Sequence, residues 1–489
     1  MSYLDLSISE IHQALVDKKV TVLDLVKESL ERAKKDTNNA FEYICEKEAL
    51  EEASKLTEIE EDNLLFGIPY VLKDNFSTKG ITTTGSSNIL KGYVPVFDST
   101  VYKKLHDAHA ILIAKATLDE LAMGGTGTTG HLGITHNPYS KERLCGGSSC
   151  GSAVAVAAGI VPFAIGSDTG DSVRKPASYT GLVGFKPTWG RISRFGLFPF
   201  APSMDHVAYF TKNVEDSEIL LSCLAGRDEL DSTSSTKEVL NYKLEAHKVD
   251  AKSKKLAIVE EIYDSITDKD VKNEFDSLVK KLENEGMKVE KVHINMNLLN
   301  AIYGTYFIIS CAEAGSNNAN LDGIKFGNRI EGESYEDLVK KTRTAGFSPL
   351  IKRRFLIGSF SLMSENQDEL FRRAQKSRRL IVNAFNNVLK DYDAIILPAA
   401  PSITPKFDDS SDKLSNEYLL ADNYLAFGNF AGLPSITVPL GFKENMPYGI
   451  NITGRIFEEA EVFSIAKNIE DLQGFSNITV LNYKEKEGK

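Results

Sequence analysis

Residues 145–176 read CGGSSCGSAVAVAAGIVPFAIGSDTGDSVRKP, and this stretch decides how the chain folds. Its small-residue segment Ser149–Ala158 predicts a helix that closes at Gly159, because glycine commonly ends helices. The apolar run Phe163–Gly166 then predicts a strand that leads into the polar turn Ser167–Gly170. A helix followed by such a strand is the repeating unit of an α/β fold.

The same alternation extends on both sides of this stretch. Further strands are predicted at 67–72, 111–114, 255–259, 288–293, 394–397 and 435–438, and further helices at 99–106, 270–285 and 460–472. This order predicts an α/β fold whose sheet is largely covered. Residues 1–60 predict a helical segment with Ser7 and Thr21 as caps, and the polar residues 229–254 predict a surface excursion.

Composition excludes several classes of protein. With 42% hydrophobic and 26% charged residues, the 489-residue chain has the make-up of a soluble globular protein of one large domain or several ordinary ones. The net charge of −11 argues against direct binding of nucleic acid, because phosphate binding needs a basic surface. Five cysteines make no disulfide framework, and neither a signal peptide nor a transmembrane run is visible, so we expect a cytoplasmic protein.

The glycine- and serine-rich segment Cys145–Ser152 has more than one interpretation. It could be a flexible turn before a helix. It also fits the Gly-x-Ser-x-Gly pattern of a nucleophile elbow, which would make Ser149 a nucleophile that needs an acid and a histidine downstream. The histidines available for that role lie outside any distinctive motif; they are His206, His247 and His293.

Two further features carry chemistry. The turn that ends at Ser172 can point successive backbone N–H groups at one oxyanion, although Ser172 or Asp168 could instead cap a helix. Lys73 follows an apolar strand, where loss of solvation would make it a neutral base. The alternative for Lys73 is a surface ion pair with Asp74.

Along the chain, Lys73 is followed by Gly-Gly-Ser-Ser and then by Gly-Ser-Asp-Thr-Gly. This order resembles the amidase signature family, most closely between Gly67 and Gly190. The resemblance implies one large domain over residues 1–489, with a signature core at 67–196 and a central mixed sheet covered by helices on both faces. Position by position, it makes Lys73 the base, Ser148 the relay serine after a cis peptide bond, and Ser172 the nucleophile. It assigns the oxyanion hole to the backbone N–H groups of Thr169, Gly170, Asp171 and Ser172. Such a mechanism requires neither a histidine nor a metal.

Two positions depart from the usual pattern of that family, which has glycine in place of Cys150 and of Asp171. A carboxylate beside a developing oxyanion would repel it, so we expect the Asp171 side chain to point away from the site. Lys175, four residues later, is the expected partner if a helix begins near Ser172.

Beyond the signature motifs, the chain is similar to the A-type subunits of tRNA-dependent amidotransferases, on segments 185–197, 322–327, 352–354 and 429–434. This resemblance implies that Arg354 and Asp422 hold the α-carboxylate and α-ammonium of free glutamine, with Tyr306 lining the same pocket. If the resemblance is set aside, the residues alone favour an exposed helix position for Arg354 and a loop cap for Asp422.

The implied activity is that of a glutaminase subunit within a ligase that takes its amido group from glutamine. Ammonia would pass to a partner that uses ATP and Mg²⁺ to amidate misacylated Glu-tRNA(Gln) or Asp-tRNA(Asn), within a heterotrimer that has B- and C-type subunits. No phosphate-binding loop is visible here, so we expect this chain to hold no cofactor and tRNA to be contacted mainly through the partner. The alternatives are a free-standing amidase of other carboxamides and a catalytically silent scaffold subunit.

Overall fold

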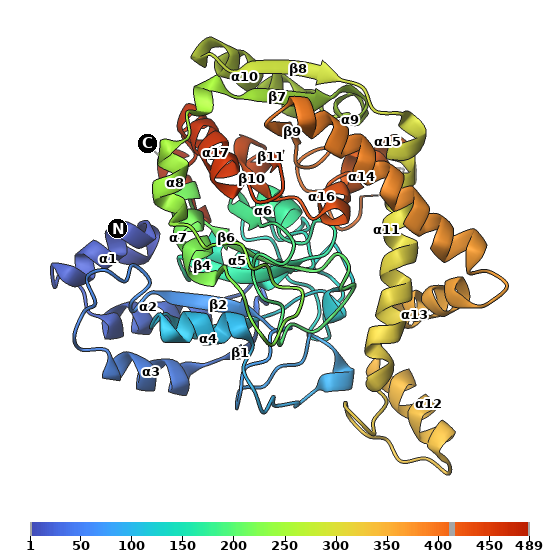
Figure 1. Ribbon diagram of the computed structural model, residues 1–489. Helices are drawn as coiled ribbons and strands as arrows, with labels where there is room; N and C mark the ends of the chain where they lie inside the picture. The colour runs from blue at the N-terminus through green and yellow to red at the C-terminus, as the bar shows by residue number, and fades with distance from the viewer. Residues whose placement is uncertain (1, 410–415, 488–489) are drawn as a thin grey trace.

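An 11-stranded mixed sheet runs through the computed structural model, which describes residues 2–409 and 416–487 (Figure 1). Its strand order is β1-β3-β2-β4-β6-β5-β10-β11-β9-β7-β8. The strands are β1 (Phe41–Ile44), β2 (Pro69–Lys73), β3 (Ile111–Ala116), β4 (Phe163–Asp168), β5 (Val183–Lys186), β6 (His206–Thr211), β7 (Lys255–Val259), β8 (Lys288–Val292), β9 (Ala394–Pro398), β10 (Ser435–Lys443) and β11 (Met446–Gly454). Parallel pairs, such as β2 with β4, coexist with antiparallel ones, such as β4 with β6. The predicted α/β fold with a mixed sheet is confirmed.

Helices cover both faces of this sheet. Gly184 and Phe185 are neighbours on β5, so their Cα–Cβ directions point to opposite faces. A Cβ on Gly184 would lie 2.5 Å from Ala177 of α6 (Arg174–Thr180). Phe185 instead packs against Phe463 of α17 (Glu459–Gln473), with the two ring centres 4.5 Å apart. Other helices near the sheet include α4 (Thr100–Asp107), α5 (Cys150–Ala157), α7 (Val214–Leu224), α9 (Glu260–Ser265) and α10 (Lys269–Glu285).

The N-terminal segment contains the expected helices and one strand that was not expected. Ser7 caps α1 (Ile8–Val16) and Thr21 caps α2 (Val22–Lys34), each within a capping box, and α3 (Glu46–Lys55) follows. Between α2 and α3 lies β1, which pairs antiparallel with β3 at the edge of the sheet. The prediction of an entirely helical segment over residues 1–60 is therefore wrong at Phe41–Ile44, because tertiary pairing with β3 outweighs the local helical context.

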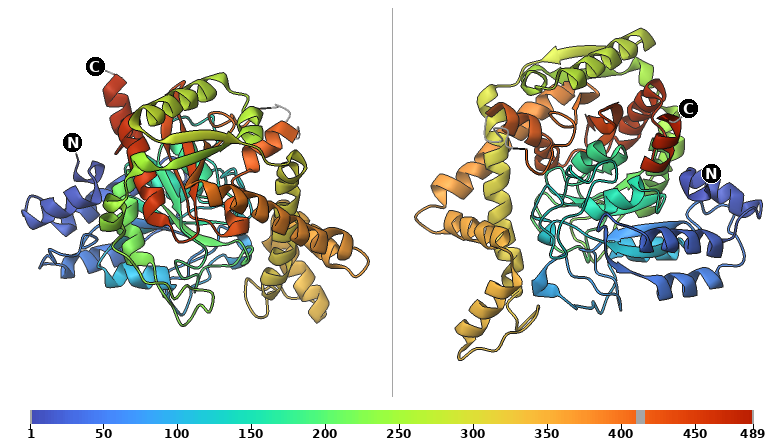
Figure 2. Two further views of the ribbon diagram at one scale, coloured as in Figure 1. Left: turned by 45° about the horizontal axis from the view of Figure 1, so that its top comes forward. Right: turned by 180° about the vertical axis from the view of Figure 1, so that it is seen from behind.

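A group of helices stands beside the sheet (Figures 1 and 2). It is built on α11 (Met296–Asn317), against which α13 (Pro349–Leu362), α14 (Arg373–Asp391) and α15 (Asn416–Asn423) pack. The rest of the helices are α8 (Tyr242–Lys248), α12 (Tyr335–Gly346), α16 (Ala426–Ala431) and α18 (Val480–Glu487). In the region 229–254, residues 236–241 are exposed, whereas α8 packs on α7 and α17. Within the described ranges, no helix is long and apolar enough to cross a membrane.

The sheet places two chemically important segments side by side. Lys73 is the last residue of β2 and Asp168 the last residue of β4, and these strands pair in parallel. The carboxyl ends of parallel neighbours meet at one edge of a sheet, so Lys73 lies next to the turn that follows Asp168.

Candidate active site

Lys73 is fully buried and surrounded by hydroxyl groups. Its Nζ lies 2.8 Å from Ser148 Oγ, 2.9 Å from Ser149 Oγ and 2.9 Å from Ser167 Oγ. Burial lowers the pKa of the Lys73 ammonium to about 7. The side chain therefore has the neutral, hydrogen-bonded form of a general base available near neutral pH.

The alternative of a surface ion pair between Lys73 and Asp74 is wrong. Both side chains are buried, and the Asp74 carboxylate lies 3.4 Å from Lys115 Nζ instead. Asp74 also accepts hydrogen bonds from the backbone and the hydroxyl of Thr84, each at 2.7 Å. Lys115, from the neighbouring strand β3, is thus the cation that pairs with Asp74.

The glycine-rich segment before α5 is a fixed loop. The Gly147–Ser148 peptide bond is cis, as the family resemblance implied. The carbonyl of Ser148 accepts the N–H of Asp119 at 3.1 Å. A Cβ on Gly147 would lie 1.9 Å from Asp119 Oδ2, so glycine alone fits there. The loop is buried and shaped by these contacts, which contradicts the interpretation as a flexible turn.

Ser149 lacks the partners of a nucleophile elbow. Its hydroxyl donates to the carbonyl of Ser167 at 3.0 Å, and no histidine of the described residues hydrogen-bonds to it. His206 contacts the Met204 carbonyl at 2.6 Å, and His293 lies on the surface beside Glu261.

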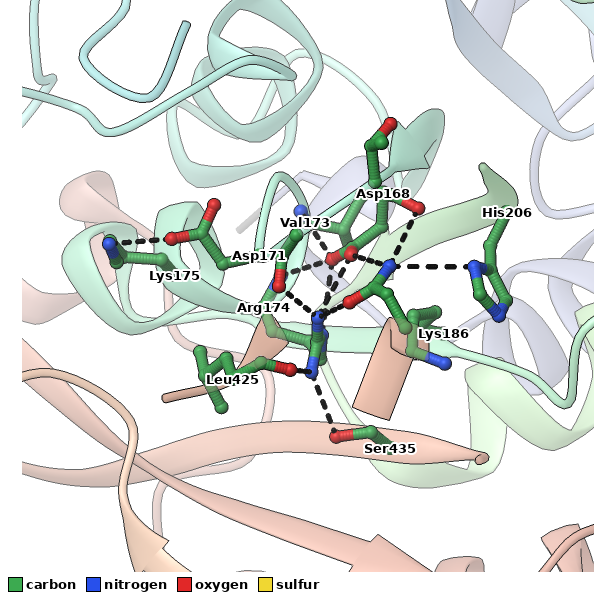
Figure 3. Close-up of polar contacts among 12 residues, drawn as sticks. Asp168, Asp171, Val173, Arg174, Lys175, Lys186, His206, Leu425 and Ser435 are labelled. Atoms are coloured by element: carbon green, nitrogen blue, oxygen red, sulfur yellow. Dashed lines mark hydrogen bonds and ion pairs between the residues drawn. The ribbon is translucent and has the colours of Figure 1, made fainter. Parts of the chain in front are cut away.

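The turn after β4 is held by a buried ion pair between Asp168, expected only as a possible helix cap, and Arg174, to which the sequence patterns gave no role. Arg174 Nη2 lies 2.9 Å from Asp168 Oδ1, and both side chains have no solvent exposure (Figure 3). Asp168 Oδ2 also accepts the N–H groups of Val173 and Arg174, at 3.0 and 3.4 Å. Burial opposes the Asp168 charge, but the Arg174 guanidinium holds the pKa of that carboxyl well below its usual range. The Asp168 carboxylate therefore accepts the first N–H groups of α6, whose N-cap is Val173, which contradicts the cap role for Ser172.

Asn429 completes this cluster. Its side chain accepts from Arg174 Nη2 at 2.6 Å and donates to Asp168 Oδ1 at 2.9 Å, while Arg174 Nη2 also donates to the carbonyl of Gly170 at 2.7 Å. In the sequence, only the polar residues within two segments, 166–176 and 429–434, pointed to this cluster. Their mutual contact spans 255 residues and is not visible in local patterns.

The backbone of the turn presents donors without partners. The N–H groups of Thr169, Gly170, Asp171 and Ser172 form no hydrogen bond within the described part of the chain. The carbonyl of Ser172 accepts the N–H of Ser149 at 3.2 Å, which fixes the turn to the glycine-rich loop. Adjacent amides of this kind form a site suited to an anion.

Of the predicted relay Lys73–Ser148–Ser172, the structure contains the first hydrogen bond. Lys73 contacts Ser148, and Ser172 reaches the same loop through its carbonyl. No hydrogen bond joins Ser148 Oγ to Ser172 Oγ in the described structure. The Asp171 side chain turns toward Lys175, with Oδ2 at 2.5 Å from Nζ, so the predicted Asp171–Lys175 pair is confirmed (Figure 3).

The three residues assigned to glutamine come from three helices around this turn. Tyr306 of α11 covers it, since a Cβ on Gly170 would lie 2.9 Å from the Tyr306 ring. Burial raises the pKa of the Tyr306 phenol, and the nearby Arg354 opposes that shift. Asp422 lies within α15, with Oδ1 at 3.1 Å from Lys175 Nζ, so it is not a loop cap.

Arg354 of α13 has an unusual environment for a cation. Its guanidinium carbon lies 5.2 Å from the ring centre of Phe307 and 5.9 Å from that of Phe200. Two of its nitrogens, Nε and Nη1, are buried without a hydrogen-bond partner among the described residues. The interpretation of Arg354 as an exposed helix residue is therefore wrong.

Among the described residues, no cluster of three or more His, Cys, Asp or Glu side chains could hold a metal ion.

Comparison with known proteins decides the family. The model of the amidase family matches residues 24–463. The chain belongs to the amidase family. It is 40% identical to the A-type subunit of the glutamyl-tRNA(Gln) amidotransferase of Pediococcus pentosaceus, over 96% of this chain and 97% of that protein. The crystal structure of the corresponding Thermotoga maritima protein superimposes with a TM-score of 0.78 at 37% identity, covering 96% of this chain and 95% of that one.

A second solved structure, of an amidase, is 28% identical with a TM-score of 0.80, and covers 96% of this chain and all of that one, at 100%. Within the amidase family, this chain therefore falls among the A-type subunits of amidotransferases, a family of ligases.

Proposed function

We propose that this chain hydrolyses free glutamine to glutamate and ammonia, as the glutaminase subunit of a tRNA-dependent amidotransferase. The observation that carries the proposal is the Arg354 guanidinium, with two buried nitrogens that lack a partner, beside a turn with four unpaired N–H groups. A partly buried cation with unpaired nitrogens is costly unless an anion joins it. The α-carboxylate of glutamine is such an anion, and two parallel hydrogen bonds from a guanidinium suit it.

The proposed reaction begins with proton transfer. Neutral Lys73 takes the proton of Ser148, and Ser148 takes that of Ser172 as the two hydroxyls meet on substrate binding. Ser172 Oγ then bonds to the carboxamide carbon, and the carbonyl oxygen receives the negative charge. The N–H groups of residues 169–172 stabilise that oxyanion.

The second half of the reaction releases both products. The proton held by Lys73 returns through Ser148 to the amide nitrogen, the C–N bond breaks, and ammonia leaves. Water then attacks the γ-glutamyl ester on Ser172 with the same base, which releases glutamate and restores the serine. Each proton taken from a nucleophile is returned to a leaving group, so the cycle needs no other acid or base.

Asp422 gives selectivity for a free amino acid. Its carboxylate would bind the α-ammonium of glutamine while Arg354 binds the α-carboxylate and Tyr306 closes the side of the site. A simple aliphatic amide would leave both charged side chains without a ligand, which makes it a poorer substrate.

The ammonia would serve a second reaction on a partner. We propose a cytoplasmic heterotrimer with B- and C-type subunits, in which ATP and Mg²⁺ act on the partner that amidates Glu-tRNA(Gln) or Asp-tRNA(Asn). The names of the relatives support this assembly. The net charge of −11 supports a tRNA site that lies mainly on the partner.

The test uses the assembled complex and two nitrogen sources. Ser172→Ala should abolish amidation from glutamine while it leaves amidation from added ammonium intact. Intact use of glutamine by Ser172→Ala would favour a scaffold role and refute the assignment. Rapid hydrolysis of hydrophobic amides by the wild-type complex, with none of glutamine, would instead identify an amidase of other carboxamides.

A further inference from the structure

Lys175 stands between two carboxylates, one of which is the proposed ligand of the glutamine ammonium. Lys175 Nζ lies 2.5 Å from Asp171 Oδ2 and 3.1 Å from Asp422 Oδ1. The side chains are 6%, 17% and 22% exposed for Lys175, Asp171 and Asp422, so water screens these charges poorly. Burial disfavours the charge on Lys175, yet the two carboxylates raise the pKa of its ammonium well above the usual value.

The charges of this cluster bear directly on substrate binding. If Lys175 were paired with Asp422 alone, the two would neutralise each other and leave no net charge for the α-ammonium of glutamine. Asp171 adds a second carboxylate, so the three side chains carry a net charge of −1. One ammonium group from the substrate then brings the buried cluster to zero.

Lys175 also controls where the Asp171 carboxylate lies. The backbone N–H of Asp171 belongs to the proposed oxyanion site, so its side chain begins next to the developing negative charge. The contact with Lys175 turns the carboxylate toward α6 (Figure 3). Without Lys175, two little-exposed carboxylates would remain close together, one of them beside the oxyanion.

We propose that Asp171 and Lys175 form a matched pair of positioning residues that sets the charge of the ammonium site and keeps the Asp171 carboxylate away from the oxyanion. This inference rests on the proposed glutaminase function. Each member of the pair compensates for the other, so the two substitutions should be harmful singly and tolerated together.

The test is a double-mutant cycle on glutamine hydrolysis by the assembled complex. Asp171→Asn should raise KM at least tenfold with kcat within threefold of wild type, because Lys175 then neutralises Asp422. Lys175→Gln should lower kcat at least tenfold, because a carboxylate then faces the oxyanion. The double variant should return both constants to within about threefold of wild type. Asp171→Gly serves as a second charge-removing variant if Asp171→Asn does not fold.

A matched control is the exposed pair Glu51–Lys55 on α3, which has the same i,i+4 spacing. Lys55→Gln should change neither constant. A second readout uses glutaramate, which is glutamine without its α-amino group. Asp171→Asn should weaken competitive inhibition by glutaramate far less than it raises KM for glutamine.

The outcomes separate the two proposals. If the wild-type complex hydrolyses glutamine but Asp171→Asn leaves KM unchanged, or if the effects in the double variant simply multiply, the matched pair is refuted alone. If the wild-type complex does not hydrolyse glutamine, the proposed function fails and this inference fails with it.

Discussion

Lys73 Nζ lies 2.8 Å from Ser148 Oγ in a fully buried environment, while the carboxylate of the next residue, Asp74, pairs with Lys115 instead. The arrangement removes water from Lys73, and no carboxylate of residues 2–409 or 416–487 forms an ion pair with it in compensation. That combination lowers the pKa of the amine, and it is the physical basis for a lysine that acts as a base.

The first prediction concerns pH. Lys73 must be neutral to accept a proton, and its pKa of about 7 means that the neutral form is lost as the pH falls through that value. For glutamine hydrolysis, kcat/KM should fall about tenfold per pH unit below pH 7 and level off above it. Steady-state rates between pH 5.5 and 8.5 check this, and a flat profile over that range would contradict the role of Lys73.

The second prediction concerns the identity of the nucleophile. A γ-glutamyl ester should form on Ser172 and not on Ser149, since only Ser172 follows the turn with unpaired N–H groups. Acid quenching during turnover, followed by peptide mass analysis, locates the added glutamyl group. Ser149→Ala should still form the ester on Ser172, although more slowly, because Ser149 also contacts Lys73 at 2.9 Å. An ester on Ser149 would favour the nucleophile-elbow interpretation.

The third prediction concerns Arg354. Replacement by methionine keeps much of the packing against Phe307 but removes the proposed ligand of the α-carboxylate. A charge-assisted, two-pronged contact is worth roughly 2–3 kcal/mol, so KM for glutamine should rise about 30- to 150-fold. Amidation from added ammonium should be unaffected in the same preparation. Arg354→Lys should rescue only partly, because an ammonium lacks the planar fork. An unchanged KM in Arg354→Met would refute the assignment.

The fourth prediction concerns stability. Arg174→Met leaves the Asp168 carboxylate buried without its cation, and breaking such a pair costs about 3–5 kcal/mol. Denaturant unfolding should show this loss at neutral pH. The double variant Arg174→Met/Asp168→Asn should recover part of it, because no unpaired charge remains. The control is Arg372→Met, which removes an exposed ion pair with Asp368 and should leave the unfolding midpoint unchanged.

Local patterns were sufficient for much of the fold. The starts of α1 and α2 were predictable because each capping box lies within four consecutive residues, Ser7 to Glu10 and Thr21 to Asp24. The buried strands β2 and β4 were predictable from their apolar runs. Strand β1 was not, because it depends on pairing with β3 about 70 residues later in the chain.

The sequence by itself determined which residue types stand at the edge of the sheet: Lys73 after one strand, and Ser148 and Ser172 in two glycine-rich segments. Only the tertiary structure decided their charges and partners. Asp74 pairs with Lys115 instead of Lys73, Arg174 meets Asn429, and Lys175 is shared between Asp171 and Asp422. The reason is physical: a capping contact depends on neighbouring residues, whereas desolvation and ion pairing depend on which distant segments the fold brings to the same place.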